Sequence, residues 1–124
     1  MKIIKQPNNI KFGLGAAKDF RFPEKSLVIT SKGASSRGWL NYTNLEKQKC
    51  FHDVEPNPSL DTAKKIISNF KNANIECVIG LGGGSSLDVA KFVGHKLGKK
   101  KILIPTTFGS GSEVTRIAVL TVKG

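Results

Sequence analysis

Residues 76–91, with the sequence ECVIGLGGGSSLDVAK, decide the fold of this chain. After Glu76, the next five residues form a continuous apolar run that ends at three glycines, which is typical of a buried strand followed by a turn. After Ser85, a helical face is marked by Leu87, Ala90, Gly94 and Leu97. The stretch therefore predicts a strand that passes through a glycine turn directly into a helix.

Four other short segments have the composition of strands. SLVITS (residues 26–31) is apolar and β-branched, and KCFHDV, around Phe51, is a second plausible strand. KILIP (101–105) ends at a proline, which stops a strand. IAVLTV (117–122) also has the composition of a strand.

Helices are expected between these strands. Ser59, after Pro56-Asn57-Pro58, is a good N-cap, and we expect Asn74 to end the helix that it starts. The apolar residues of this helix recur at helical spacing: Ala63, Ile66, Ile67, Phe70 and Ala73. The segment between SLVITS and KCFHDV should cross over partly as helix, and Gly33 and Gly38 leave its limits open.

Apolar strands that alternate with amphipathic helices predict an α/β fold, with a Rossmann-like parallel sheet and helices on both faces. We expect residues 1–124 to form one domain. Ligands on such sheets bind outside the carboxyl ends of the strands. The two most glycine-rich loops, residues 82–84 and 105–113, both follow predicted strands. These loops are therefore the candidate binding site.

Composition narrows the classes of function. The 124 residues include 20 Lys and Arg against 9 Asp and Glu, a formal charge of +11. That charge attracts anions of many kinds, but no aromatic residues interleave with the scattered lysines, so we expect no nucleic-acid partner. No apolar run can span a bilayer and no signal sequence is visible, so we expect no membrane association and a cytoplasmic location. Cys50 and Cys77 form no CxxC motif, and neither is expected to be catalytic.

The first loop can bind phosphate. Glycines allow a ligand to approach the backbone, and a helix start presents N–H groups at the positive end of the helix dipole. Together these features predict a pyrophosphate site, with Ser85 capping the helix and donating its hydroxyl. The alternative is a tight turn that needs glycine for packing alone, because the loop is neither G-x-G-x-x-G nor a Walker sequence.

The second loop, Pro105 to Glu113, has four hydroxyl side chains and two glycines directly after a predicted strand. These groups can donate hydrogen bonds to a ribose and to phosphates. The alternative is a solvated turn in which Ser112 caps a short helix.

The two loops together carry a family resemblance. GLGGGSSLDVAK followed by ILIPTTFGSGSEVT, with VEPNPS upstream, closely resembles the paired signature of the iron-containing (group III) metal-dependent alcohol dehydrogenases. The resemblance covers most of the chain from about Phe12 onward. It implies a Rossmann-like N-terminal domain of the kind shared with dehydroquinate synthase, a helical metal-binding C-terminal domain, and NAD or NADP in the cleft between them.

The resemblance also implies roles for individual residues. Gly83, Gly84 and Ser85 would cradle the pyrophosphate, Asn57 would lie near the cofactor, and Asp88 would stand close to the nicotinamide. The adenosine and ribose would be wrapped by Thr106, Thr107, Gly109 and Ser110, and Val119 would line the site from the last strand. Lys91 matches a family lysine and is expected to pair with Asp88 within the helix.

Three features depart from the family. Ser31 stands where the family commonly has an aspartate that binds the adenosine ribose, and the crossover from Ser31 to Phe51 is shorter than usual. The helical domain with the metal ligands is expected to be absent from this chain, so iron or zinc is expected only where that domain is present. His52 and His95 match no metal-site spacing and are not expected to be ligands.

The resemblance implies an oxidoreductase that transfers a hydride between NAD(P) and a small alcohol or aldehyde. Two alternatives remain open: a nucleotide-binding module or inactive remnant without catalysis, and an enzyme like glycerol or glycerol-phosphate dehydrogenase. A homo-oligomer is possible. Because Ser31 is uncharged and Lys32 and Arg37 follow it, we expect NADP(H) to be accepted at least as well as NAD(H).

Overall fold

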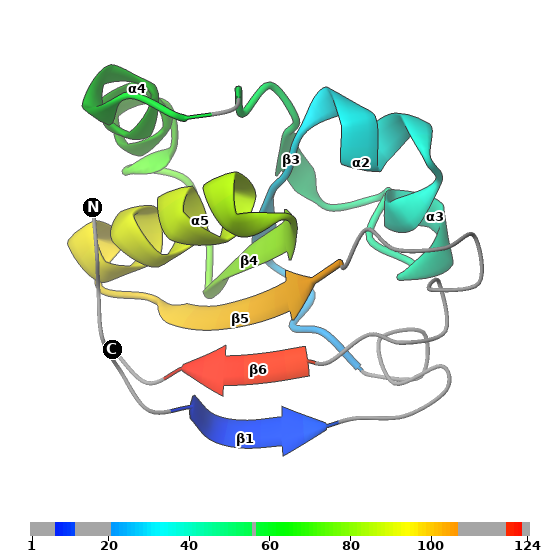
Figure 1. The fold of residues 1–124 in the computed structure, drawn as a ribbon. Coiled ribbons are helices and arrows are strands. Elements are labelled where there is room, and N and C mark those ends of the chain that lie inside the picture. Colours follow the sequence, from blue (N-terminus) through cyan, green and yellow to red (C-terminus); the bar gives the residue numbers. More distant parts are fainter. Residues whose placement is uncertain (1–6, 12–20, 56, 107–118, 123–124) are drawn as a thin grey trace.

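The computed structural model describes residues 7–11, 21–55, 57–106 and 119–122. In this part of the chain, a six-stranded sheet has the order β1-β6-β5-β4-β2-β3 (Figure 1). The strands are β1 (Pro7–Lys11), β2 (Ser26–Ile29), β3 (Lys49–Phe51), β4 (Cys77–Gly82), β5 (Lys100–Pro105) and β6 (Val119–Val122). Strands β2, β3, β4 and β5 are parallel, which confirms the predicted parallel sheet.

The sheet continues beyond β5 with two strands of a different direction. Strand β6 is antiparallel to β5, with Ile102 opposite Thr121, and β1 is antiparallel to β6. The sequence indicated β6 but not β1, because the segment PNNIK has a proline and two asparagines, which are depleted in strands. Pairing with β6 therefore overrides a poor local preference.

Helices cover both faces of the sheet, as predicted. Because side chains alternate along a strand, Leu27 and Ile29 of β2 face one layer and Val28 faces the other. The first layer holds α4 (Leu60–Phe70) and α5 (Gly84–Leu97), and its core includes Leu27, Ile29, Ile66, Val78 and Val89. The second holds α2 (Lys32–Ser36) and α3 (Trp39–Tyr42), and its core includes Val28, Ala34, Trp39, Ile79 and Ile104.

The ends of the two long helices agree only in part with the predictions. Ser59 is the N-cap of α4, and its hydroxyl accepts a hydrogen bond from the backbone N–H of Thr62, as expected of a cap. The helix ends at Phe70, so the prediction that Asn74 ends it is wrong. The N-cap of α5 is Gly83, with no side-chain cap, so the prediction that Ser85 caps this helix is also wrong.

Two glycines bring α5 close to the sheet. A Cβ at Gly80 of β4 would lie 2.7 Å from the Cβ of Ala90, which is closer than real side chains approach. On the helix side, a Cβ at Gly94 would overlap the side chain of Lys101 in β5. The first layer is therefore packed so tightly that these positions have no room for a larger residue.

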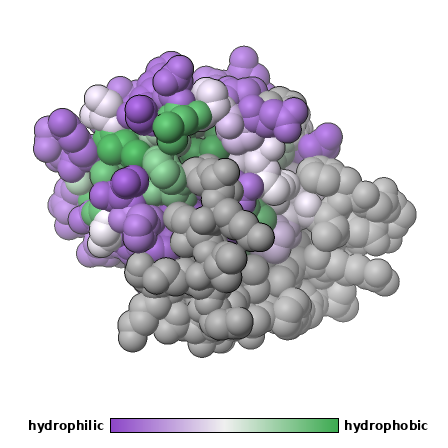
Figure 2. Space-filling model, turned by 60° about the vertical axis from the view of Figure 1, so that its left-hand side comes forward, coloured by the Kyte–Doolittle hydropathy of each residue, from purple (hydrophilic) through white to green (hydrophobic). Residues whose placement is uncertain are grey.

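The outer surface of the first layer is not uniformly polar. Figure 2 shows a hydrophobic region bordered by hydrophilic residues. Leu60, at the start of α4, is 51% exposed, and Ile67, Phe70 and Phe92 are only partly buried.

In the described segments, no helix has both the length and the apolar character that crossing a bilayer requires.

Candidate functional site

The carboxyl ends of three parallel strands are tied together by hydrogen bonds. The Thr30 hydroxyl, just after β2, donates to the Leu81 carbonyl of β4 at 2.7 Å. The Thr106 N–H, just after β5, donates to the Gly82 carbonyl at 2.9 Å. Because these groups are buried, the bonds hold the edge of the sheet rigidly in the place where ligands of such folds bind.

A pocket of about 290 Å³ opens at this edge. It is lined by Ser31, Val54 and Glu55 together with residues 83–86. The structure therefore brings together four predicted site residues, Ser31, Gly83, Gly84 and Ser85, although they come from segments some 50 residues apart in the sequence. Their proximity is a product of strand order, since β2 and β4 are neighbours in the sheet.

The glycine turn shapes one wall of this pocket. Gly82 has a φ of 132°, a conformation that favours glycine, and Gly83 is extended, so that α5 begins at Gly84. The first hydrogen bond of the helix runs from the Leu87 N–H to the carbonyl of the N-cap Gly83 at 3.1 Å, so the preceding N–H groups of α5 have no partner within the helix. Among the described residues, a Cβ at Gly84 would meet no atom within 4 Å, which leaves the backbone open to a ligand.

Ser31 has a structural role at the same pocket. It is the N-cap of the short helix α2, and its hydroxyl oxygen accepts a hydrogen bond from the Ala34 N–H at 3.1 Å. The hydroxyl hydrogen remains available, because only the oxygen is used in this bond. The uncharged side chain at the end of β2 is thus explained in part by local capping.

The other predicted site residues are less closely gathered. Asn57 is exposed with a φ of 52°, and it does not line the pocket. Asp88 forms the expected ion pair with Lys91, at 3.3 Å, and is also absent from the lining. Val119 begins β6, opposite Lys11 of β1. Thr107, Gly109 and Ser110 lie outside the described residues.

Thr106 is placed at the edge with an unused polar group. Its side chain is 4% exposed, and its hydroxyl oxygen has no hydrogen-bond partner among the described residues. A buried hydroxyl without a partner costs about 1–3 kcal/mol. The hydroxyl is therefore suited to bind a polar group of a ligand.

The sequence reasoning missed three lining residues, Val54, Glu55 and Ser86, of which Glu55 has a charged side chain. Its Oε1 accepts a 2.6 Å hydrogen bond from the Thr62 hydroxyl and a 3.3 Å bond from the Ser59 N–H. The bond from Thr62, followed by that from Ser59, lowers the pKa of Glu55, so the side chain is an anion at neutral pH. The signal was its place in VEPNPS, four residues before the N-cap Ser59, where a carboxylate can reach back to the helix start.

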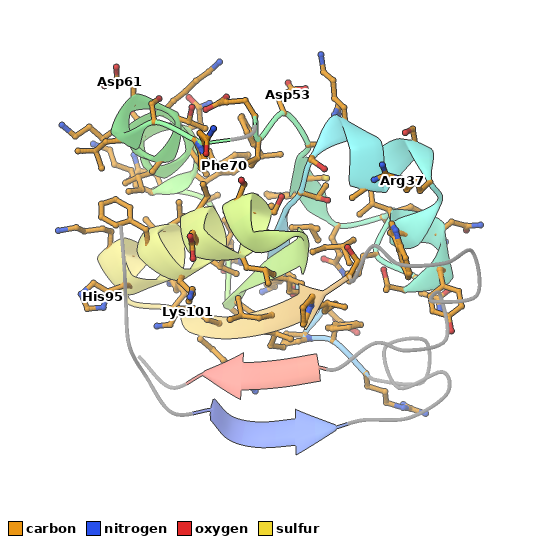
Figure 3. All side chains as sticks on the ribbon, in the orientation of Figure 1. Arg37, Asp53, Asp61, Phe70, His95 and Lys101 are labelled. Atoms are coloured by element: carbon orange, nitrogen blue, oxygen red, sulfur yellow. The ribbon has the colours of Figure 1, made fainter. Side chains whose placement is uncertain are left out.

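The charges beside the pocket partly pair with one another. Lys32 Nζ lies 3.7 Å from Asp53 Oδ1, and His52 Nδ1 lies 3.6 Å from the same oxygen. His95 is in the last turn of α5, at the far end of that helix from the pocket (Figure 3). Within the described residues, no three His, Cys, Asp or Glu side chains are grouped so that they could hold a metal ion.

The two cysteines are poor nucleophiles at neutral pH. Burial, followed by the charge of Asp53, raises the pKa of Cys50 to about 11. Burial raises the pKa of Cys77 to about 12. Both groups are therefore protonated thiols at neutral pH.

Known proteins resemble this chain along most of its length. The family model described as iron-containing alcohol dehydrogenase matches residues 7–124. Long-chain-alcohol dehydrogenase 1 of Geobacillus thermodenitrificans is 38% identical over 94 residues, covering 59% of this chain and 24% of that protein. Choline dehydrogenase of Bacillus subtilis is 32% identical, covering 93% of this chain and 37% of that protein.

A solved structure is also similar to this chain. The iron-containing alcohol dehydrogenase of Thermotoga maritima superposes with a TM-score of 0.63 at 30% identity, covering 73% of this chain and 32% of that one. The chain thus spans 24–37% of the length of these three proteins. By its sequence, its sheet and its glycine turn, the chain belongs to the iron-containing alcohol dehydrogenase family of oxidoreductases.

Proposed function

We propose that this chain is the NAD(P)-binding domain of an oxidoreductase that interconverts a small alcohol and an aldehyde. The observation that carries the proposal is the pocket at the start of α5, where Gly83, Gly84 and Ser85 meet Ser31 across the carboxyl ends of the strands. Family membership supplies the oxidoreductase class. Related proteins include a long-chain-alcohol dehydrogenase, a 1-propanol dehydrogenase and a sulfoacetaldehyde reductase, which supports the alcohol or aldehyde as substrate class.

The residues of the pocket suit a dinucleotide diphosphate. The N–H groups of Gly84 and Ser85 and the positive end of the α5 dipole would bind phosphate oxygens, and the open space at Gly84 would admit them. The Thr106 hydroxyl would bind a ribose or phosphate oxygen at the end of β5. When bound, the nicotinamide would supply the hydride chemistry; the chain's own part is to hold and orient it.

If the oxidoreductase uses a metal ion, we propose that its ligands lie outside the described residues. The family description names iron, and a metal of this kind polarises a substrate oxygen as a Lewis acid. The described histidines, cysteines and carboxylates do not fit such a site, since no three of them are grouped. We therefore assign no catalytic step to any side chain in the described part of the chain.

Calorimetric titration with NADH and NADPH tests the proposal through the variant Gly84→Val. The valine side chain would occupy the open space beside the α5 start, and dinucleotide binding should be abolished. The matched control is Ser68→Val, which places the same side chain on an exposed position of α4. Unchanged affinity in a folded Gly84→Val variant, or no binding by the unmodified chain, would remove the proposal.

A further inference from the structure

One residue, Thr30, connects the three segments that line the pocket. Its hydroxyl donates to the Leu81 carbonyl at 2.7 Å, near the end of β4 and just before the glycine turn. Its backbone N–H donates to the Phe51 carbonyl of β3 at 2.9 Å, and its carbonyl accepts from the Val54 N–H at 3.2 Å. The next residue in the chain is Ser31, which lines the pocket. The relative positions of the pocket walls therefore depend on Thr30.

We propose that Thr30 is the positioning residue of this pocket. Its hydroxyl holds the glycine turn, residues 82–84, in the shape that receives a diphosphate, and it does so without touching the ligand. Thr30 is fully buried, at 0% exposure, and it is not one of the residues that line the pocket. The inference rests on the proposed dinucleotide site and adds the residue that keeps this site in its binding shape.

The glycine turn has to be held from outside because its own residues are flexible. Glycine adopts positive and negative φ about equally readily, so the φ of 132° at Gly82 is one of several conformations open to it. The Leu81 carbonyl and the Gly82 N–H belong to one planar peptide unit. A hydrogen bond from Thr30 to that carbonyl therefore fixes the plane from which the chain turns into α5.

A second hydrogen bond holds the next peptide unit. The Gly82 carbonyl, which shares a plane with the Gly83 N–H, accepts from the Thr106 N–H at 2.9 Å. The turn is thus held from both neighbours of β4, by a side chain just after β2 and by a backbone group just after β5. Of these two bonds, the one from Thr30 is made by a side chain, so a single substitution removes it and leaves the backbone pairing in place.

The Thr30 hydroxyl extends the contact between β2 and β4 beyond their backbone pairing. That pairing ends at Ile29 and Gly80. The backbone N–H of Thr30 is bonded to β3 on the other side, so it is not available to β4. The hydroxyl makes the connection one residue farther along, to the buried Leu81. A nonpolar side chain of the same shape would deprive the Leu81 carbonyl of this partner and free the turn to change conformation.

The test compares the dissociation constants of NADH for the unmodified chain, Thr30→Val, Thr30→Ser and Thr43→Val, by calorimetry at a temperature at which all are folded. Valine has the shape of threonine without the hydroxyl, and serine keeps the hydroxyl. Thr43→Val is the matched control. Thr43 is also buried, and its hydroxyl donates to the Trp39 carbonyl at 2.8 Å, at the end of α3 and outside the pocket lining.

We expect Thr30→Val to weaken NADH binding roughly three- to tenfold, because the apparent affinity falls with the fraction of molecules whose turn has the binding shape. Thr30→Ser should restore most of the affinity. Thr43→Val should leave the affinity within about twofold, although it also loses a buried hydrogen bond, since distant sites act independently. Amide hydrogen exchange at residues 83–87 should become faster in Thr30→Val and not in Thr43→Val.

Unchanged affinity in folded Thr30→Val, or an equal loss in Thr43→Val, would overturn the inference while leaving the dinucleotide site intact. If Thr30→Val does not fold, Thr30→Cys takes its place, because a thiol fills similar space and is a weak donor. Thr30→Cys should then bind NADH more weakly than Thr30→Ser, and equal affinities would count against Thr30 in the same way. Failure of the unmodified chain to bind NADH would instead remove the proposed function, and the inference with it.

Discussion

Two glycine-to-alanine substitutions on either side of the same turn should have opposite effects on stability. Gly84 is the first residue of α5, and a Cβ there would meet no atom of the described part of the chain within 4 Å. Alanine at such a position reduces the conformational freedom of the unfolded chain and stabilises the fold by about 0.4–1 kcal/mol. At Gly80 the same atom would lie 2.7 Å from the Cβ of Ala90 and 3.3 Å from Leu103 and Leu87, so α5 would have to shift.

The expected difference in stability between Gly80→Ala and Gly84→Ala comes from steric overpacking alone. Gly80→Ala gains a similar entropic contribution but suffers overpacking, which costs about 1–3 kcal/mol. For 124 residues with an unfolding entropy of about 2.1 cal/mol/K each, this difference corresponds to roughly 4–11 °C in melting temperature. Gly84→Ala alone should raise the melting temperature by roughly 1.5–4 °C.

Thermal unfolding followed by circular dichroism measures both variants against the unmodified chain. Equal melting temperatures for the two variants, or a loss of stability in Gly84→Ala as large as that in Gly80→Ala, would refute the packing argument. The same pair separates stability from binding. Gly84→Ala should be more stable and yet bind dinucleotide more weakly, because its methyl group extends into the space proposed for the pyrophosphate.

Three further predictions concern the α4 cap and the thiols. Ser59→Ala should lower the free energy of unfolding by about 0.5–2 kcal/mol in urea titrations, because the Thr62 N–H loses its cap, whereas Ser59→Asn should retain most of it. Because the pKa of Glu55 is lowered in the folded state, its contribution to stability is present above its unfolded pKa and is lost as the pH falls through the folded pKa. Glu55→Gln should therefore reduce the loss of stability over this acidic pH range in an acid-unfolding curve. An unchanged curve would contradict the hydrogen bonds from Thr62 and Ser59 to Glu55. Cys50 and Cys77, with pKa values of about 11 and 12, should resist alkylation by iodoacetamide at pH 7 in the folded chain and react after denaturation; rapid labelling of the native protein would show that the burial is wrong.

Local patterns in the sequence were sufficient to predict the elements that bury apolar side chains. The strand at Cys77–Gly82 and the helix capped by Ser59 were both predicted, because apolar continuity and capping act between residues close in sequence. The glycine turn between β4 and α5 was predicted for the same reason. The parallel order of strands with helices on both faces followed from their alternation.

Tertiary structure decided what depends on residues far apart in the chain. Strand β1 forms from a segment with poor strand propensity because β6 pairs with it. Gly83 rather than Ser85 caps α5, because the positive φ of Gly82 sets where the chain turns into the helix. The pocket itself needs Ser31 and Glu55 to meet the α5 start, and only the neighbouring positions of β3, β2 and β4 in the sheet bring them there. Sequence spacing carries no information on which strands become neighbours, so the charge in the lining of the pocket became visible only in the folded chain.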